Sequence, residues 1–409
     1  MRILHTCHTY WPHADGVSVV MQRISEGLAS RGHDVTVATG PGAGPACEVR
    51  NGVTIRRFRI AGNEALGYEG ETDAFTQFVT SAPADVVLAY AAQICTTDLL
   101  LPLAATLPAA TVLAACGYSG LHDRRYAGYF AALPGFLRAF DAVVYHSGGY
   151  QDAEFAARHG LANGVVIANG ADPPPEPPEP GRFRDAYGIG ERRVLLSVGR
   201  VEANKGQDVV LQALAASRIT DTAAVFVCPE VSRFAAGALR TPAGPLYRPR
   251  WEARALARRV AARLPGGSAS RLSWRLPNGN AVYVLAGLPR QDVLAAYGDA
   301  DLFVFGSRVE CAPLVVLEAM AAGLPFVSTP VGNVPELAGG VLVNGADEMA
   351  AAVHRLVRRG DEWERLARAG REAWARDHRW EHIVGRYEGL YERLTRERAA
   401  RGRPGAAAG

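Results

Sequence analysis

Hydrophobic positions along this chain follow two alternating patterns. Short apolar runs rich in β-branched residues are typical of buried strands. They alternate with segments in which apolar residues recur every three or four positions, as on one face of a helix. The first series predicts a strand at residues 2–6, a helix at 17–31 and a strand at 34–38. Because this order forms a right-handed crossover, the pattern predicts a parallel sheet covered by helices.

The same alternation continues on both sides of a proline-rich run at residues 173–180. Further strands are expected at residues 85–89, 111–115, 142–145 and 165–168 before this run, and at 193–198, 224–228, 281–285, 302–305 and 325–329 after it, with a helix at 207–216 and a helical stretch at 361–396. Prolines lack the backbone donors of a strand ladder. The run therefore favours a stiff extended linker, with a long surface loop as the alternative.

These patterns predict an α/β protein with two Rossmann-like parallel-sheet domains. We place the first domain at residues 1–172, the linker at 173–190 and the second domain at 191–375. A C-terminal helix at 376–400 is expected to cross back to the first domain. Since ligands of parallel sheets bind beyond the carboxyl ends of the strands, we expect a central cleft that both domains face.

Composition narrows the classes of function. The 409 residues are 48% hydrophobic and 21% charged, which is typical of a soluble globular protein, and a net charge of only +3 disfavours a chain-wide nucleic-acid binder. The six cysteines form no C-x-x-C pair, so neither a zinc site nor a disulfide framework is expected. The N-terminus lacks the apolar segment of a signal peptide, and we expect a cytoplasmic enzyme.

Two segments that contain arginines leave alternatives open. Residues 231–280 form an insertion-like region, in which 251–264 has the pattern of an amphipathic helix with a solvated face. Residues 122–140 combine arginines with aromatic residues. They fit either an interfacial segment that contacts a membrane or an amphipathic helix packed on its own domain.

Two glutamates separated by seven residues give the strongest chemical signal. Glu310 falls in the loop after a predicted strand, and Glu318 lies near the start of the helix that follows. Free backbone N–H groups and the positive end of a helix attract phosphate, and carboxylates accept hydrogen bonds from sugar and ribose hydroxyls. The alternative is that Glu310 caps a helix and Glu318 pairs with an arginine.

A second loop follows the first strand of the second domain. Gly199 and Gly206 permit close backbone approach, and Arg200 and Lys205 bracket the loop between them. Two cations in this arrangement suit a diphosphate leaving group. The alternative is a pair of solvated cations at a helix start.

Two loops of the first domain carry weaker signals. Gly16 stands just before a helix, where its backbone could meet a phosphate, although the surrounding residues do not form a dinucleotide-binding G-x-G-x-x-G. His122 could face the cleft and meet a sugar, or it could have a structural role. A metal site formed by His5, His8 and His13 is disfavoured, because His5 is expected to pack along a strand.

Taken together, these motifs resemble the retaining GT-B glycosyltransferases often numbered family 4. The resemblance covers nearly the whole chain and is carried by four matches in order: Gly16 with residues 31–37, the asparagine–glycine turn at 167–172, Gly199-Arg200 with Lys205-Gly206, and Glu310 to Glu318. It implies transfer of a hexosyl unit from a nucleoside-diphosphate sugar to an acceptor, with retention of the anomeric configuration.

The resemblance also implies a role for each site residue. Arg200 and Lys205 would hold the donor diphosphate, Glu310 the donor sugar and Glu318 the ribose hydroxyls. The backbone N–H groups of Leu314 and Val315 would meet phosphate, Gly16 would approach the phosphate from the first domain, His122 would face the sugar, and Leu288 would line the nucleobase pocket. A UDP- or GDP-linked sugar would be the donor, with no cofactor and no metal, and the acceptor is not indicated.

The chain departs from the family pattern after Glu310. Cys311-Ala312-Pro313 stands where the family has Gly-Phe-Gly, and this change bears on sugar recognition more than on the fold. Two other functions share the architecture: a sugar-nucleotide epimerase or disaccharide phosphorylase, and a non-catalytic sugar-nucleotide-binding protein. If residues 122–140 are interfacial, we expect this cytoplasmic enzyme to lie at the inner face of the membrane.

Overall fold

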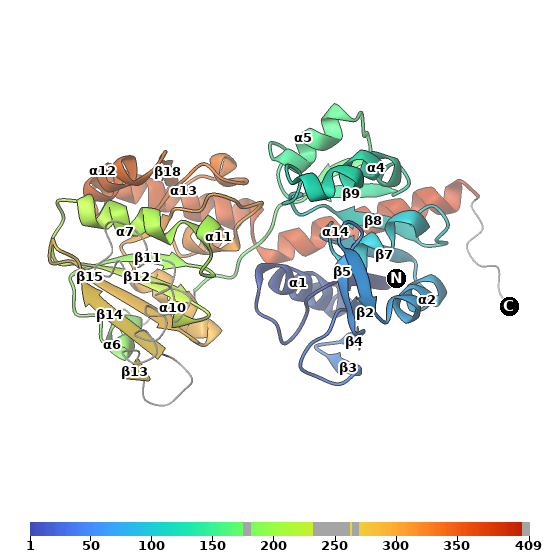
Figure 1. Cartoon of the computed structure of the whole chain (residues 1–409), viewed down its shortest axis with the longest axis horizontal. Helices are drawn as coiled ribbons and strands as arrows, with labels where there is room; N and C mark the ends of the chain where they lie inside the picture. Colours follow the sequence, from blue (N-terminus) through green and yellow to red (C-terminus); the bar gives the residue numbers. More distant parts are fainter. Residues whose placement is uncertain (175–180, 232–261, 264–269, 403–409) are drawn as a thin grey trace. The chain divides into compact units, whose positions relative to one another are not determined.

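The computed structural model describes residues 1–174, 181–231, 262–263 and 270–402, which form two compact α/β units (Figure 1). Unit 1 comprises residues 1–170 and 377–409, and unit 2 comprises residues 171–376. Unit 1 is therefore built from both ends of the chain, whereas unit 2 is one continuous segment.

Unit 1 contains an eight-stranded sheet. Its strands, in spatial order, are β10 (Gly164–Val166), β9 (Ala142–Tyr145), β8 (Ala110–Ala114), β7 (Val86–Tyr90), β1 (Arg2–Cys7), β2 (Asp34–Thr39), β4 (Val53–Arg57) and β3 (Cys47–Arg50). Every neighbouring pair is parallel except β3 with β4. The predicted parallel sheet is thus confirmed, and its central strands β7, β8 and β9 are buried throughout, as strands covered on both faces are.

Helices and a hairpin complete unit 1. They are α1 (Gly16–Ser30), α2 (Thr72–Ser81), α3 (Cys95–Asp98), η1 (Leu101–Leu103), η2 (Arg124–Tyr126), α4 (Ala127–Leu137), α5 (Gln151–Arg158), α14 (Trp380–Ala400), and the hairpin of β5 (Ile60–Asn63) and β6 (Gly67–Gly70). The strands between residues 47 and 70 were not predicted. They are short and lack the apolar runs that mark the other strands: β3, β5 and β6 contain many exposed or half-buried positions, and β4 has only Val53 and Ile55 as buried positions.

His5 joins three elements of unit 1. It lies fully buried on β1, its Nδ1 is 2.8 Å from the Oγ of Ser25 on α1, and its Nε2 is 3.1 Å from the hydroxyl oxygen of Tyr391 on α14. Burial lowers the pKa of His5 to about 3, so the ring is neutral in the folded protein. This buried pair of hydrogen bonds holds the last helix of the chain against the first strand and the first helix.

Unit 2 contains a second eight-stranded sheet. Its strands, in spatial order, are β13 (Ala262–Arg263), β14 (Ser270–Arg275), β15 (Ala281–Ala286), β12 (Thr222–Cys228), β11 (Arg193–Val198), β16 (Leu302–Phe305), β17 (Phe326–Ser328) and β18 (Gly340–Leu342). Its helices are α6 (Arg182–Tyr187), η3 (Ala203–Lys205), α7 (Gln207–Ala216), α10 (Arg290–Asp299), α11 (Leu314–Ala321), η4 (Val334–Glu336), α12 (Ala346–Leu356) and α13 (Asp361–Asp377). The strands from β15 to β18 are parallel, and β13 and β14 form an antiparallel edge.

Both faces of the unit 2 sheet are covered by apolar cores. On β12, Ala224 and Phe226 belong to one core, and Val225 and Val227 belong to the other. Successive side chains of a strand point to opposite faces, so a strand covered on both sides is apolar without alternation. This explains why the strands of the second half could be predicted from continuous apolar runs.

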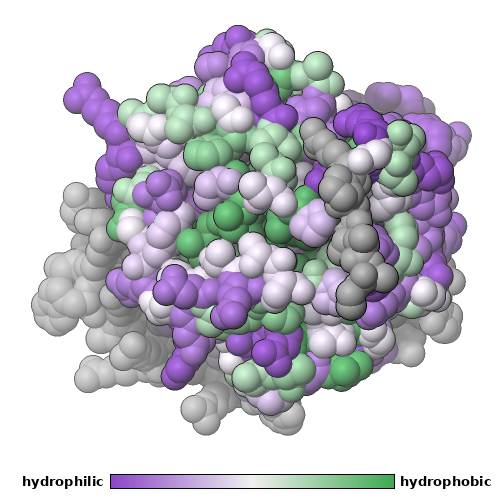
Figure 2. Space-filling view, turned by 90° about the vertical axis from the view of Figure 1, so that its right-hand side faces the viewer, coloured by the Kyte–Doolittle hydropathy of each residue, from purple (hydrophilic) through white to green (hydrophobic). Residues whose placement is uncertain are grey.

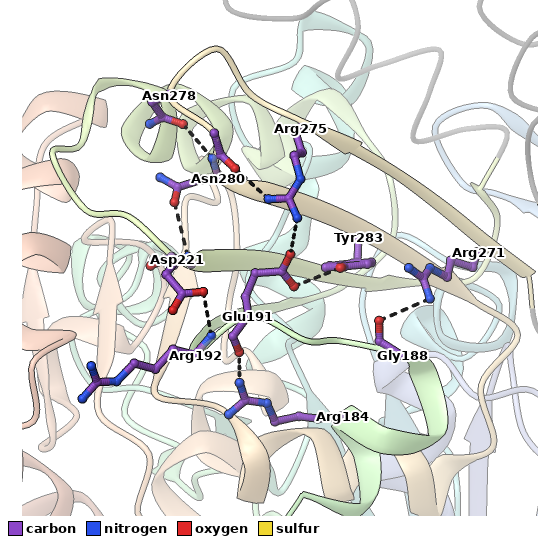
Figure 3. Close-up of polar contacts among 12 residues, drawn as sticks. Arg184, Gly188, Glu191, Arg192, Asp221, Arg271, Arg275, Asn278, Asn280 and Tyr283 are labelled. Atoms are coloured by element: carbon purple, nitrogen blue, oxygen red, sulfur yellow. Dashed lines mark hydrogen bonds and ion pairs between the residues drawn. The ribbon is translucent and has the colours of Figure 1, made fainter.

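A network of polar contacts fastens the antiparallel edge of this sheet (Figure 3). The buried carboxylate of Glu191 accepts hydrogen bonds from Arg275 of β14 at 3.1 Å and from the hydroxyl of Tyr283 of β15 at 2.9 Å. The guanidinium of Arg271 lies 4.6 Å from the ring of Tyr283 and donates to the carbonyl of Tyr187 on α6. The network lies at the start of β11, away from the edge that carries the predicted donor site.

Several expectations fall on residues outside the described ranges. These are most of the proline run at 173–180 and most of the expected helix at 251–264, of which the described residues 262–263 pair as strand β13. The helical stretch expected at 361–396 divides into α13 and α14 at His378, whose Nδ1 lies 3.0 Å from the carbonyl oxygen of Asn169.

The aromatic side chains of residues 122–140 mostly pack inside unit 1. Tyr129, Phe130 and Phe140 are buried in its core. On the face drawn in Figure 2, hydrophobic residues are scattered among hydrophilic ones. The burial of these three rings favours the packed amphipathic helix over an interfacial segment. Within the described part of the chain, every helix is too short or too polar to cross a bilayer.

We predict that replacing His5 with glutamine changes how stability depends on pH. The folded histidine has a lowered pKa, whereas the unfolded one binds a proton below about pH 6.5, so protonation favours unfolding as the pH falls. Between pH 7 and pH 5 the wild type should lose about 2 kcal/mol of unfolding free energy that His5→Gln does not lose. Urea unfolding of the whole chain at both pH values measures this difference. Equal losses of unfolding free energy in the wild type and in His5→Gln would contradict the lowered pKa of His5.

Candidate active site

Three loops gather at the carboxyl edge of the unit 2 sheet. The loops that follow β11, β15 and β16 contain residues 199–206, 287–289 and 306–313. Because the carboxyl ends of parallel strands meet at the same edge, these segments come together although they are distant in sequence. They hold four of the expected site residues, Arg200, Lys205, Leu288 and Glu310, and three more follow the third loop on α11.

Hydrogen bonds join the first and third of these loops. The carbonyl oxygen of Asn204 accepts from the backbone N–H of Arg308 at 2.7 Å and lies 3.0 Å from the Oγ of Ser307. The guanidinium of Arg308 donates to the carbonyl of Ala203 and forms a two-pronged ion pair with Asp208, at 2.9 and 2.6 Å. The two loops therefore form one structural element.

Gly206 lies against the backbone of the loop after β16. Its φ of +61° lies in the left-handed region that favours glycine. A Cβ atom at this position would lie only 1.7 Å from the carbonyl oxygen of Gly306. Any side chain would thus push the loops apart, and only glycine allows the adjacent Lys205 to reach the loop after β16.

Lys205 and Glu310 form an ion pair. The Nζ of Lys205 lies 2.7 Å from the Oε1 of Glu310, and the Oγ of Ser307 lies 2.9 Å from the same oxygen. The lysine and glutamate side chains are 18% and 13% exposed, so the pair is sheltered but open to solvent on one side. Lys205 is also the only lysine in the sequence, since every other basic side chain is arginine or histidine.

Glu318 is more deeply buried, with 4% of its side chain exposed. Its Oε1 accepts from the guanidinium of Arg290 at 2.5 Å, and its Oε2 accepts from the hydroxyl of Tyr297 at 2.8 Å. Burial by itself lowers the pKa of Arg290, but the charge and hydrogen bond of Glu318 raise it above its ordinary value. The alternative in which Glu318 pairs with an arginine is therefore realised, although a paired carboxylate can still accept further hydrogen bonds.

The start of α11 lies between the two glutamates. Pro313 is its N-cap residue, and the N–H groups of Leu314 and Val315 lie in the first turn, where the helix offers them no carbonyl partner. Pro313 has no N–H and so removes the donor of the N-cap position, but the N–H groups of Leu314 and Val315 are unaffected. The substitution at this position therefore leaves the expected phosphate-binding N–H groups in place.

Two expected donor residues of unit 2 stand apart from these contacts. Arg200 is 62% exposed and lies 3.4 Å from Glu202. Leu288 is half-buried and packs against the core of unit 2. The structure thus brings Lys205 and Glu310 into direct contact, while Arg200 points to a neighbour in its own loop.

Gly16 and His122 belong to unit 1. Gly16 is the first residue of α1 and is exposed, and the side chain of Asp15 caps this helix by accepting from the N–H of Ser18 at 3.1 Å. Within the described residues, a Cβ atom on Gly16 would meet nothing within 4 Å. His122 is exposed in a turn. Their predicted contacts with phosphate and sugar stay predictions.

Other side chains at the carboxyl edge of the unit 1 sheet were not predicted. The Nε2 of His146 lies 3.0 Å from the hydroxyl oxygen of Tyr90 and 3.5 Å from the Sγ of Cys116, and its Nδ1 lies 3.0 Å from the carbonyl oxygen of Ile167. Because a carbonyl only accepts, Nδ1 donates and Nε2 is the acceptor. Burial raises the pKa of the Cys116 thiol to about 12, so this group stays protonated.

The sequence held signals for some of the residues that it did not identify. Arg290 and Tyr297 are seven residues apart, which is two helical turns, so they share one face of α10. Ser307 had no such signal, because its place beside Glu310 depends on how two loops meet.

Comparison with known proteins places this two-unit α/β fold among the GT-B glycosyltransferases. The structure resembles sucrose-phosphate synthase from Thermosynechococcus elongatus with a TM-score of 0.71 at 19% identity, covering 97% of this chain and 99% of that chain. It also resembles HepE from Anabaena, solved in complex with UDP and glucose, with a TM-score of 0.67 at 16% identity, covering 96% of this chain and 100% of that chain.

Sequence comparison agrees with the fold. Residues 15–170 match the model of the glycosyl transferase 4-like domain, and residues 250–359 match the model of glycosyl transferases group 1. The chain belongs to the group 1, family 4-type glycosyltransferases with the GT-B fold, as the motifs predicted.

Curated relatives include several glycosyltransferases. A GDP-mannose-dependent phosphatidylinositol monomannoside mannosyltransferase from Mycolicibacterium smegmatis is 28% identical, over 56% of this chain and 54% of the relative. A D-inositol 3-phosphate glycosyltransferase from Streptosporangium roseum is 30% identical, over 49% of this chain and 42% of the relative. The chain spans about half the length of the curated relatives that it matches.

We predict that Gly206→Ala destabilises unit 2 by at least about 2 kcal/mol, because its Cβ would collide with the carbonyl of Gly306 and its φ is strained for alanine. Gly298→Ala is the matched control. Gly298 lies in α10, a Cβ atom there would meet nothing within 4 Å in the described residues, and alanine favours helix. Thermal unfolding compares the two, and equal melting temperatures would show that the loops tolerate a wider spacing.

Proposed function

We propose that this protein transfers a hexosyl unit from a ribonucleoside-diphosphate sugar to an acceptor, with retention of the anomeric configuration. The observation that carries the proposal is the contact of Lys205 with Glu310 directly before the start of α11. A cation, a carboxylate and free helix N–H groups at one edge provide partners for a diphosphate and for sugar hydroxyls. Family membership supports this interpretation.

Stabilisation of the leaving group is the main catalytic task of the site. When the bond between the anomeric carbon and the diphosphate breaks, negative charge develops on the leaving phosphate. Lys205 and Arg200 supply positive charge there, and the N–H groups of Leu314 and Val315 add preorganised donors. Arg200 is exposed and its pairing with Glu202 is loose at 3.4 Å, so it can turn toward a bound diphosphate.

Retention follows from attack on the same face of the sugar. The acceptor hydroxyl oxygen forms its bond to the anomeric carbon as the bond to phosphate breaks. The hydroxyl proton passes to an oxygen of the leaving phosphate, which becomes protonated nucleoside diphosphate. In this scheme Glu310 binds the hydroxyls of the donor sugar, and the contacts of His122 and Gly16 with sugar and phosphate stay predictions. No metal takes part in the proposed reaction.

The relatives supply the first donor to test. The relative from Mycolicibacterium smegmatis is named for its dependence on GDP-mannose, whereas the HepE structure contains UDP and glucose. We therefore propose a GDP- or UDP-linked hexose as donor and begin with GDP-mannose. The cytoplasmic location, and contact with a membrane that carries the acceptor, stay predictions.

We predict that Lys205→Met lowers the rate of sugar transfer by about 100- to 1,000-fold, because it removes a positive charge from the leaving phosphate. It should also abolish the rise in melting temperature that GDP or UDP gives the wild type. Arg355→Met is the control. It also replaces a cation of an ion pair with methionine, but this pair, between Arg355 on α12 and Glu362 on α13, is exposed and belongs to neither glutamate of the candidate site. Wild-type protein that gains no thermal stability from either nucleotide, even at millimolar concentration, would argue against a donor site.

We also predict that transfer proceeds at an unchanged rate in excess EDTA and yields a product with the anomeric configuration of the donor. Proton NMR of the product reads the configuration from the coupling of the anomeric proton. An inverted product would overturn attack on the same face. Loss of activity in EDTA, restored by a divalent cation, would show that the positive charges of the protein do not suffice to stabilise the leaving phosphate.

A further inference from the structure

The carboxylate of Glu318 is fixed before any ligand arrives. One oxygen accepts from Arg290 at 2.5 Å and the other from Tyr297 at 2.8 Å. The side chain of Glu318 is 4% exposed, and Tyr297 is buried with it. Two donors on opposite oxygens determine both the position and the plane of the carboxylate.

Both donors come from one helix. Arg290 is the first residue of α10 and Tyr297 lies two turns further on, so the same face of α10 meets Glu318 on α11. Tyr297 belongs to the core, whereas the Arg290 side chain is 44% exposed. Arg290 therefore lies between the core and solvent, and its guanidinium also comes within 3.9 Å of Asp172.

A carboxylate has about four lone-pair positions, two on each oxygen. In Glu318 each oxygen uses one of them, for Arg290 or for Tyr297. One lone-pair position on each oxygen thus stays available for a ligand. Two neighbouring hydroxyls on adjacent carbon atoms match this pattern, and the 2′- and 3′-hydroxyls of ribose are such a pair.

We propose that Arg290 and Tyr297 are positioning residues that hold Glu318 to bind both ribose hydroxyls at once, and that they thereby make the site selective for ribonucleotides over 2′-deoxyribonucleotides. The inference rests on the proposed function, in which Glu318 contacts the ribose. It adds the residues that determine this selectivity. Without Arg290, the buried carboxylate of Glu318 loses one of the two hydrogen-bond donors that orient it.

The contact between Arg290 and Glu318 is made by a single nitrogen, Nη2. A two-pronged contact would require the planar guanidinium, but a contact through one nitrogen can be made by an ammonium group. Lysine should therefore replace Arg290 in this role, whereas methionine, which keeps the apolar stem, should not.

The test measures the dissociation constants of GDP, dGDP, UDP and dUDP by isothermal titration calorimetry. For the nucleotide that binds, the wild type should prefer the ribo form by about 10- to 100-fold, since a hydrogen bond to a charged acceptor is lost in the deoxy form. Arg290→Met should reduce this preference to less than about 3-fold and leave the affinity for the deoxy form within about 3-fold. Arg290→Lys should restore most of the preference, and Tyr297→Phe should lower it in part.

Each other result has a distinct meaning. If the wild type binds GDP and dGDP equally, the proposed function survives and this inference falls. Arg290→Met could instead weaken the binding of the ribo and deoxy nucleotides by the same factor, with an unchanged melting temperature. In that case Arg290 contacts a part of the nucleotide other than the ribose, and the inference also falls. A lower melting temperature with an unchanged preference would show a purely structural ion pair. If the wild type binds no nucleotide, the proposed function falls together with the inference.

Discussion

The close approach of Gly206 to the carbonyl of Gly306 is the contact on which the donor site depends. The parallel sheet brings the loops after β11 and β16 to the same edge, but it does not determine how near they come. That distance is set where two backbones touch without a side chain between them. Lys205, the neighbour of Gly206, can then reach Glu310, and the hydrogen bonds of Asn204 and Arg308 hold the loops in this position.

Unit 1 depends on a different kind of constraint, because it needs both ends of the chain. The hydrogen bonds of His5 join β1 and α1 to Tyr391, which lies 386 positions later in the sequence. The side chain of Glu388 on the same helix accepts from Arg31 and lies 2.8 Å from His33, both directly after α1. Buried and half-exposed polar contacts thus join α14 to the rest of unit 1. Unit 2, in contrast, builds its sheet from one continuous segment of the sequence.

Apolar periodicity predicted most of the fold, because strands that are buried on both faces form unbroken apolar runs. The helix at 207–216 and the strand at 302–305 were predicted with the bounds that the structure has. The strands between residues 47 and 70 escaped prediction because they are short and lack unbroken apolar runs, and even β4 has only two buried positions, Val53 and Ile55. At the site, spacing identified Lys205, Glu310 and Glu318 as residues of interest. It could not identify which cation meets which carboxylate, since that depends on tertiary contact between α10, α11 and two loops.

The two glutamates of the site differ in how firmly they are held, and this difference suits two tasks. Glu310 shares one oxygen between a flexible lysine and a serine, in a place open to solvent on one side. Glu318 has a separate donor on each oxygen and is almost fully buried. A substrate that carries its own phosphate can compete with Glu310 for the lysine, so this pair can open when the donor binds. Glu318 makes no such exchange, because each of its oxygens already has its own donor in unit 2. In the proposed reaction the pair of Lys205 and Glu310 would therefore adjust to the donor, while Glu318 would stay fixed.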